Sequence, residues 1–276
     1  MAINNQQRKG TRMELYYRKT GNGFPLVIIH GLYGSSDNWI SIARKLEQQY
    51  TVYMPDLRNH GRSPHAETHT YNDLANDIRT FFEQHNIKQA TLIGHSMGGK
   101  AAMWFAARFP EKINRLIIAD IAPQSYLTAE NKQAFLHHII LQKMQEIDFS
   151  MVKSRKDADH FLSEKISETR IRRFLLKNVV KHQQTGKYHW QINVSVLYRH
   201  LKEIVNGVNQ DWLKEFMPIT AYPVTFIRGL SSNYISATAI RSIKTIYPNA
   251  QIIDIPDAGH WLHAEKPEEF VQAVIK

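Results

Sequence analysis

The feature of the sequence that most constrains the fold is the pentapeptide GHSMG at residues 94–98, which matches the pattern G-x-S-x-G. The apolar run before it, residues 89–93, is typical of a strand, and residues 99–108 after it form a helix-favouring segment without a breaker. Ser96 is therefore predicted to lie on a sharp turn between a strand and a helix. Such a turn strains the backbone of its central residue and pushes the serine hydroxyl out of the sheet, as a nucleophile requires.

A second turn of this kind is predicted at HGLYG, residues 30–34, which follows the apolar run FPLVII at residues 24–29. A near-continuous apolar run is typical of a strand that is buried on both faces. A His-Gly turn at the end of such a strand can present a backbone N–H to a substrate oxygen. We predict that the N–H groups of Leu32 and Met97 form an oxyanion hole, whose donors are each typically worth ~3–4 kcal/mol in a transition state.

A histidine lies in a third predicted turn, AGHW at residues 258–261, near the end of the chain. The turn follows a strand-like run at residues 251–255 and precedes a C-terminal helix over residues 266–276, which has Pro267 near its first turn. His260 is thus predicted to lie on a loop at the end of the last strand. We expect it to act as the general base that takes the Ser96 proton.

Four segments together resemble the α/β-hydrolase family, and most nearly a bacterial esterase subfamily that has mitochondrial relatives. The segments are HGLYGSSDNW (30–39), DLRNHGRSPH (56–65), GHSMGGK (94–100) and GHWLHAEKP (259–267). They span most of the chain outside residues 122–218, and jointly they are specific for the fold. The resemblance implies a serine carboxylic ester hydrolase that needs no cofactor and forms an acyl-enzyme.

The alternation of segments along the chain agrees with this fold class. Strand-like runs alternate with helical stretches, which predicts a mostly parallel sheet covered by helices on both faces. The strand-like runs are residues 13–18, 25–29, 51–55, 89–93, 115–119, 223–228 and 250–255.

Between the two halves of this alternation, helical periodicity replaces the strand signal, apart from a short strand-like piece at residues 188–192. The helices expected there are residues 128–147, 155–166, 168–182, 193–206 and 209–216. We therefore predict an α/β-hydrolase core made of residues 1–121 and 219–276, with an inserted helical cap, or lid, at residues 122–218.

The acid that orients the base is not where this family usually has it. The loop that follows the next-to-last strand, residues 229–234, contains no carboxylate, and Ser232 stands about where an aspartate is usual. Asp120 ends the strand beside that of the nucleophile, so its side chain is predicted to emerge at the same sheet edge and orient His260. The alternative is that Asp120 only caps a turn, and that Asn233 or a backbone carbonyl holds His260.

Other acids and histidines are predicted to have supporting roles. Asp257 is too near His260 in sequence to curl back onto the ring, Asp254 should lie within its strand, and Asp56 should hold the loop at residues 57–63. Packing and hydrogen bonding are expected of the remaining histidines of the motifs. No metal motif accompanies them, so neither a metal nor a cofactor is predicted. These histidines are His30, His60, His65, His95 and His263.

The formal net charge of +10 is not accompanied by a nucleic-acid-binding motif, so nucleic acid is not an expected partner. A predicted helix within residues 167–182 places Arg170, Arg173, Lys177 and Lys181 on one face. This pattern has two interpretations: an ordinary amphipathic helix of the cap, or a surface that attracts anionic lipid or acidic substrates in a weak peripheral contact.

The chain contains no cysteine, no apolar run of transmembrane length and no secretory signal at residues 1–12, which together predict a cytoplasmic protein. By analogy with the resembled family, a homodimer built through the cap is one expectation. The substrates expected are small to medium acyl esters or lipid-like esters.

Two other functions stay open at this stage. One is a lyase of menaquinone synthesis on the same fold, whose similar elbow has an arginine where this chain has Lys100. The other is a non-catalytic binding protein that retains the hydrolase fold.

Overall fold

A seven-stranded sheet forms the centre of the structure, a computed structural model that describes residues 13–127, 132–208 and 214–276. The strands are β1 (Tyr17–Thr20), β2 (Phe24–Ile29), β3 (Tyr50–Pro55), β4 (Ala90–His95), β5 (Ile113–Ala119), β8 (Val224–Gly229) and β9 (Gln251–Ile255). Their order across the sheet is β1-β3-β2-β4-β5-β8-β9, and all neighbours are parallel except β1, which pairs antiparallel with β3. The predicted fold class, a mostly parallel sheet of the α/β-hydrolase type, is confirmed.

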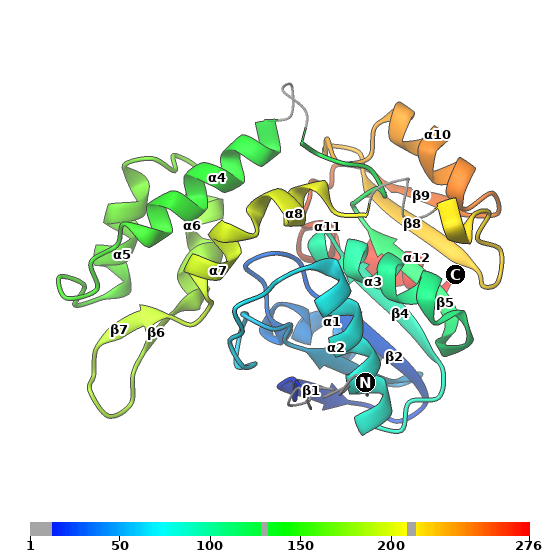
Figure 1. The fold of residues 1–276 in the computed structure, drawn as a ribbon, viewed down its shortest axis with the longest axis horizontal. Helices are drawn as coiled ribbons and strands as arrows, with labels where there is room; N and C mark the ends of the chain where they lie inside the picture. Colours follow the sequence, from blue (N-terminus) through cyan, green and yellow to red (C-terminus); the bar gives the residue numbers. More distant parts are fainter. Residues whose placement is uncertain (1–12, 128–131, 209–213) are drawn as a thin grey trace, which may run out of the picture.

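Helices cover both faces of this sheet (Figure 1). Alternating side chains of β2 show why: Val27 and Ile29 are buried in one apolar core, and Leu26 and Ile28 in the other. Because successive strand residues point to opposite faces, a continuous apolar run requires a helical layer on each side. The covering helices are α1 (Ile40–Leu46), α2 (Tyr71–Gln84), α3 (Met97–Arg108), α10 (Ala237–Ile246), α11 (Leu262–Glu265) and α12 (Pro267–Ile275). The first core contains residues of α2, α3 and α10, and the second contains residues of α1 and α12.

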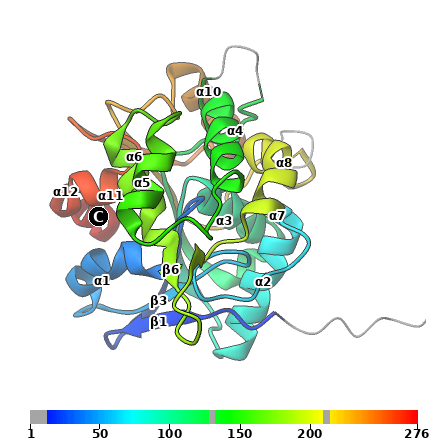
Figure 2. The ribbon, with the colours of Figure 1, turned by 90° about the vertical axis from the view of Figure 1, so that its left-hand side faces the viewer.

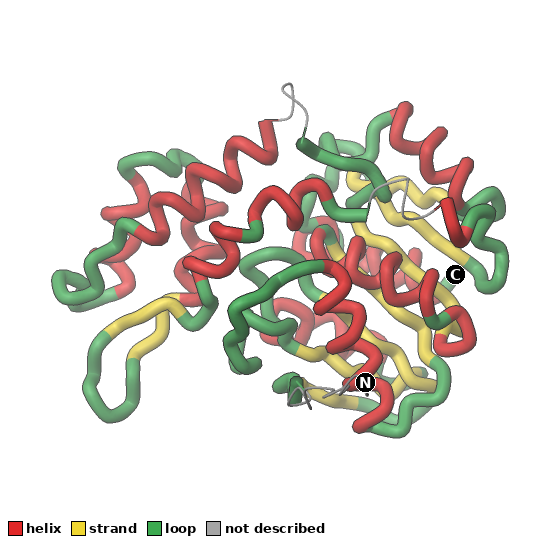
Figure 3. Tube along the Cα trace, viewed as in Figure 1, coloured by secondary structure: helices red, strands yellow, loops and turns green. Residues whose placement is uncertain are grey.

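The described residues between β5 and β8, 120–127, 132–208 and 214–223, add no strand to the central sheet. Their helices lie to the left in Figure 1 and face the viewer in Figure 2, and Figure 3 shows that they are mainly helical with one small hairpin. Their elements are α4 (Lys132–Gln145), α5 (Arg155–Ser163), α6 (Thr169–Leu175), β6 (Val179–Lys181), β7 (Tyr188–Trp190), α7 (Val194–Arg199) and α8 (Leu201–Asn206). We call residues 122–218 the inserted segment. The division of the chain into a core and a cap at its two ends stays a prediction.

The predicted helix over residues 168–182 is wrong. Helix α6 ends at Leu175, a 3₁₀ turn follows, and Val179 and Val180 then form β6, which pairs antiparallel with β7. β-Branched side chains pack well in a hairpin, and this pairing outweighs the helical periodicity of the sequence. Lys181 therefore lies on β6 rather than on a helix face with Arg170, whereas Arg170, Arg173 and Lys177 still border one hollow.

Smaller differences concern element boundaries. The first strand begins at Tyr17 rather than Met13, and the helix expected over residues 193–206 is two helices that meet at His200. Of the helix expected over residues 209–216, only a 3₁₀ turn at Lys214–Phe216 lies in the described residues. The expectation for residues 1–12 also lies outside them.

Lys100 on α3 ties the start of the inserted segment and the end of α8 to the core. Its side chain is buried, and its Nζ donates to the carbonyl oxygens of Gln124 at 2.9 Å, Val205 at 3.1 Å and Asn206 at 3.1 Å. Gln124 lies just after β5, and Val205 and Asn206 end α8. One amine therefore holds the chain at both places. Burial lowers the pKa of Lys100 to about 7, and a neutral amine still donates two hydrogen bonds. A Cβ at position 207 would lie 2.2 Å from the Lys100 side chain, so Gly207 is required there.

Replacement of Lys100 should loosen this attachment. In Lys100→Met we expect the free energy of unfolding to fall by about 2–4 kcal/mol, because three buried carbonyl oxygens lose their donor. Urea unfolding followed by tryptophan fluorescence measures the change. Lys88→Met is the control, since Lys88 is exposed. Equal stability of the two variants would show that Lys100 does not hold the inserted segment.

Candidate active site

The backbone of Ser96 adopts the strained conformation expected of a nucleophile on a sharp turn. Its φ of 54° and ψ of −123° lie outside the regions that side-chain-bearing residues prefer. Space is also restricted: a Cβ at Gly94 would lie 2.5 Å from the Gly98 oxygen, and one at Gly98 would lie 2.3 Å from the His30 oxygen. The turn therefore needs glycine at both positions, because β4, α3 and the end of β2 meet there.

Ser96, His260 and Asp120 form a continuous hydrogen-bonded chain. The Ser96 hydroxyl donates to His260 Nε2 at 3.0 Å, and His260 Nδ1–H donates to Asp120 Oδ2 at 2.8 Å. Because a carboxylate only accepts, the tautomer of His260 leaves Nε2 free to accept the serine proton. The contact expected between Asp120 and His260 is present, and Asn233 makes no such contact with the ring. This chain can transfer a proton from the hydroxyl while the buried carboxylate balances the imidazolium charge.

The loop after β8 supports the Asp120 carboxylate although it contains no acid. The Gly229 N–H donates to Asp120 Oδ1 at 3.1 Å, and the Ser232 hydroxyl donates to Asp120 Oδ2. The carboxylate is fully buried, so these donors stabilise its charge where water is absent. Ser232 stands about where the resembled family usually has an aspartate, and its role as a donor to Asp120 was missed. A short hydroxyl side chain at that position was the available signal.

Tyr234 was also missed as a residue of the site. Its ring stacks on the His260 ring, with centroids 3.9 Å apart and an interplanar angle of 19°. No local pattern indicates this contact, because 26 positions, a helix and a strand separate the two residues. The other expected supporting residues lie as predicted: His95 Nε2–H donates to the His260 carbonyl at 2.8 Å, and His263 is buried in a stack on Trp39.

The two predicted oxyanion donors lie on either side of the nucleophile. Leu32 follows Gly31, whose backbone passes so close that a Cβ there would lie 3.1 Å from Ser96 Cβ. Met97 opens α3, and the first N–H groups of a helix have no partner inside it. Both residues border the same cavity wall as Ser96. Their action on a substrate oxygen stays a prediction.

Two buried histidines brace the loop that carries Leu32. His30 Nδ1–H donates to the Gly31 carbonyl at 2.8 Å, so its Nε2 accepts the Leu57 N–H at 2.9 Å. His60 Nδ1–H donates to the Arg58 carbonyl at 3.0 Å, and its Nε2 accepts the Tyr33 N–H at 3.3 Å. Each imidazole therefore reaches from one loop to a backbone N–H of the other.

Both of these imidazoles are neutral in the folded protein. Burial lowers the pKa of His30 to about 4 and that of His60 to about 3. Protonation would place a ring N–H against a backbone N–H in each bond, so the brace needs the neutral rings. The histidines that sequence reasoning assigned to packing and hydrogen bonding thus hold the oxyanion loop in place.

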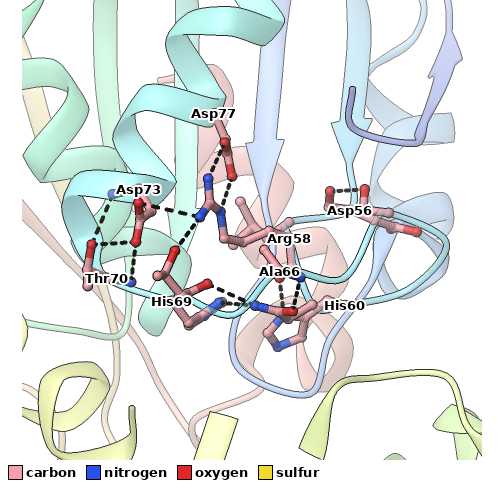
Figure 4. A network of polar contacts seen from close by, with 12 residues as sticks. Asp56, Arg58, His60, Ala66, His69, Thr70, Asp73 and Asp77 are labelled. Carbon is pink, nitrogen blue, oxygen red and sulfur yellow. Dashed lines mark hydrogen bonds and ion pairs between the residues drawn. The ribbon is translucent and has the colours of Figure 1, made fainter. Parts of the chain in front are cut away.

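The loop that contains His60 is itself fixed by a buried ion pair (Figure 4). Arg58 Nε and Nη2 donate to the two carboxylate oxygens of Asp77 at 2.6 and 2.7 Å, and Nη1 donates to Thr68 Oγ1 at 2.9 Å. Asp56 accepts the Ser36 N–H at 2.6 Å and the Arg62 N–H at 2.8 Å, as expected of a residue that holds this loop. A bidentate pair of this kind fixes geometry as well as adding energy.

A cavity of about 300 Å³ opens at Ser96 and His260, which is near the lower end of the range for ligand pockets. It lies between the core and the inserted segment, and a second hollow of about 30 Å³ adjoins it. Ser96, Leu32, His137 and Tyr234 border both spaces, so the nucleophile lies at their junction. Apolar side chains dominate the wall of the larger space, among them Leu136, Ile140, Ile171, Phe174, Leu175 and Trp261.

Over residues 13–127, 132–208 and 214–276, no cluster of three or more histidine, cysteine or acidic side chains is placed to hold a metal ion. His65, for which hydrogen bonding was predicted, binds the Gln191 carbonyl at 3.0 Å. In the same ranges, no helix combines the length and apolar character needed to cross a membrane.

Comparisons with known proteins all find hydrolases that are similar to this chain. A family model described as alpha/beta hydrolase fold matches residues 25–267. The zebrafish sn-1-specific diacylglycerol lipase ABHD11 is 38% identical over 92% of this chain and 78% of its own length, and Esterase YbfF of Escherichia coli is 34% identical over 92% of both. A solved structure named Marine microorganism esterase is 43% identical, with a TM-score of 0.89 over 95% of this chain and 98% of its own.

The buried histidine brace predicts an acid-sensitive fold. The unfolded chain binds a proton at His60 below about pH 6.5, whereas the folded protein does so only near pH 3, so stability falls as the pH falls through this window. In His60→Gln, which keeps a side-chain acceptor but does not titrate, the slope of unfolding free energy between pH 6 and pH 4 should decrease by about 1.4 kcal/mol per pH unit.

Urea unfolding at several pH values measures this slope. His189→Gln, at an exposed position of β7, is the matched control and should keep the wild-type slope. A wild-type slope in His60→Gln would contradict a neutral, buried imidazole at position 60.

Proposed function

The chain belongs to the alpha/beta hydrolase fold family and is a serine hydrolase of carboxylic esters, and we propose that Ser96, His260 and Asp120 perform the reaction. The observation that carries the assignment of these residues is the chain of two hydrogen bonds, 3.0 and 2.8 Å long, that links the three side chains. Ser96, at one end of these hydrogen bonds, has a strained backbone and borders a largely apolar cavity.

Ester hydrolysis would proceed by acylation of Ser96. His260 Nε2 accepts the hydroxyl proton as Ser96 Oγ attacks the carbonyl carbon, and the resulting tetrahedral oxyanion accepts hydrogen bonds from the Leu32 and Met97 N–H groups. The His260 imidazolium then gives its proton to the leaving alcohol, which leaves the acyl group on Ser96. Water attacks the acyl-enzyme with His260 again as base, and the acid is released.

Asp120 acts through His260 rather than on the substrate. Its carboxylate holds the Nδ1–H tautomer and balances the charge of the imidazolium that forms. The donors from Gly229 and Ser232 hold the carboxylate at the position it needs. The acid is therefore placed after β5, and the usual acid position after β8 contributes a hydroxyl instead.

The shape of the site supports small to medium acyl esters or lipid-like esters as substrates. The larger space is lined mainly by apolar side chains and suits an acyl or alkyl chain, while the hollow of about 30 Å³ has room for little more than a water-sized group. The relatives reported above are named as an esterase and as a diacylglycerol lipase.

The alternative functions gain no support from these observations. The relatives reported above carry esterase or lipase names, and the intact hydrogen-bonded chain argues against a binding protein without activity. A cytoplasmic location, a homodimer through the inserted segment and a peripheral membrane contact stay predictions.

Ser96→Ala should abolish covalent labelling by a fluorophosphonate probe and lower the turnover of p-nitrophenyl butyrate by roughly 10⁴–10⁶-fold, because the members of a catalytic triad act as a unit. His260→Ala should be as damaging, whereas His263→Ala, at a stacking residue, should cost far less. Gel fluorescence and absorbance assays measure both effects. Labelling of Ser96→Ala at the wild-type level would remove Ser96 from the mechanism.

Asp120→Asn should keep the fold but lower turnover by roughly 10²–10⁴-fold, because an amide can hold the wrong tautomer of His260 and does not balance its charge. Ser232→Ala should cost about 3–10-fold, since Asp120 keeps its other donor. Asp254→Asn removes a carboxylate from an ion pair with Arg228 in the next strand and serves as the control. Equal activity of Asp120→Asn and Asp254→Asn would refute the assignment of the acid.

A further inference from the structure

Three polar side chains from distant parts of the chain meet at the wall of the larger cavity. The Tyr33 hydroxyl lies 3.3 Å from His137 Nδ1, and the Tyr234 hydroxyl lies 3.4 Å from His137 Nε2. His137 comes from α4 of the inserted segment, Tyr33 from the loop after β2 and Tyr234 from the loop after β8. All three line the cavity that contains Ser96, and the proposed ester hydrolysis uses none of their polar atoms.

The side chains of this trio have more polar hydrogen atoms than hydrogen bonds with one another. Burial lowers the pKa of His137 to about 4, so at neutral pH its ring has one N–H and one accepting nitrogen. With two tyrosine hydroxyls, the trio carries three hydrogens, and its two contacts use two of them. One hydrogen is thus left without an acceptor among the described residues. Both contacts are near the outer limit of hydrogen-bond length, so the trio does not close tightly on itself.

The position of the trio is fixed relative to the reacting groups. The Tyr234 ring stacks on His260 at a centroid distance of 3.9 Å, and Tyr33 directly follows Leu32 in the oxyanion loop. His137 and Tyr234 also border the small hollow beside Ser96. A ligand atom that binds the spare hydrogen therefore lies in the same cavity as a carbonyl carbon held at Ser96.

We infer that Tyr33, His137 and Tyr234 form a subsite for an uncharged substrate oxygen next to the scissile ester. This inference rests on the proposed hydrolysis at Ser96 and narrows its substrates to esters with a hydroxyl, ether or carbonyl oxygen near the ester group. Such an oxygen accepts the spare hydrogen. A carboxylate fits poorly, because the adjoining wall at Leu136 and Ile140 is apolar and a buried charge with one hydrogen bond is costly.

Two pairs of matched esters test the subsite and locate its oxygen. On the acyl side, p-nitrophenyl methoxyacetate is compared with p-nitrophenyl butyrate, which has a methylene in place of the oxygen. On the alcohol side, 2-hydroxyethyl butyrate is compared with propyl butyrate. For each pair, kcat/KM of the oxygenated ester is divided by that of the alkyl ester. Intrinsic reactivity cancels when this quotient is compared between wild type and variant.

The triple variant Tyr33→Phe/His137→Leu/Tyr234→Phe has no polar hydrogen at this position. We expect its quotient to fall about 5–20-fold for the pair whose oxygen occupies the subsite, as for the loss of a buried hydrogen bond. Tyr234→Phe alone keeps the ring stacked on His260 and moves the spare hydrogen to another atom, so its quotient should fall about 2–5-fold. The single variant carries the test if the triple variant does not fold.

The double variant Tyr222→Phe/Tyr247→Phe is the matched control. It removes two hydroxyls that have no partner among the described residues and that lie outside both cavities, so it should keep the wild-type quotient.

Each remaining outcome counts against the subsite in a different way. An unchanged quotient for both pairs in Tyr234→Phe and in the triple variant overturns it, as does an equal loss for the oxygenated and alkyl esters, which would show that the trio only maintains the shape of the site. If the wild-type protein hydrolyses none of the four esters, the proposed ester hydrolysis itself fails. Hydrolysis of all four with unchanged quotients leaves that function intact and removes only the subsite.

Discussion

The candidate site depends on the alignment of parallel strands, whose carboxyl ends meet at one edge of the sheet. Ser96 follows β4, Asp120 follows β5 and His260 follows β9, and the loop after β2 adds Leu32. Parallel pairing of these strands therefore brings together residues up to about 230 positions apart without any long-range signal in the sequence. It also explains how Asp120, after β5, and Ser232, after β8, both lie beside the loop that carries His260.

Buried side chains keep the backbone rigid near this edge of the sheet. Among them, the histidines are uncharged. His30 and His60 each accept a backbone N–H from the loop that carries the other histidine. The ion pair of Arg58 and Asp77 holds the loop that contains His60. An oxyanion hole acts only if its N–H groups are already in place when the charge develops, so the proposed role of the Leu32 N–H requires a rigid loop. Lys100 does the equivalent for the inserted segment, because one amine links the chain just after β5 to the end of α8.

Local patterns were enough to predict the strands of the sheet and the positions of Ser96 and His260. Apolar runs and glycine-bounded turns are properties of a few consecutive residues, and they need no knowledge of the rest of the chain. Asp120 was predicted by combining the missing carboxylate after β8 with the geometry of a parallel sheet. Ser232 and Tyr234 were missed as partners of Asp120 and His260, because their contacts arise only when two strand-end loops pack together. The helix predicted through residue 182 was wrong for the same reason: pairing with β7, a tertiary contact, makes residues 179–181 a strand.

The covalent intermediate provides the most direct test of the central claim that hydrolysis proceeds through Ser96. Protein mixed with excess p-nitrophenyl butyrate and quenched in acid within milliseconds can be digested and analysed by mass spectrometry. The account predicts a butyryl group on the peptide that contains Ser96, formed together with a burst of p-nitrophenol, and no such group in Ser96→Ala. The claim would be contradicted by a butyryl group that is attached to another residue and is released at the rate of ester hydrolysis.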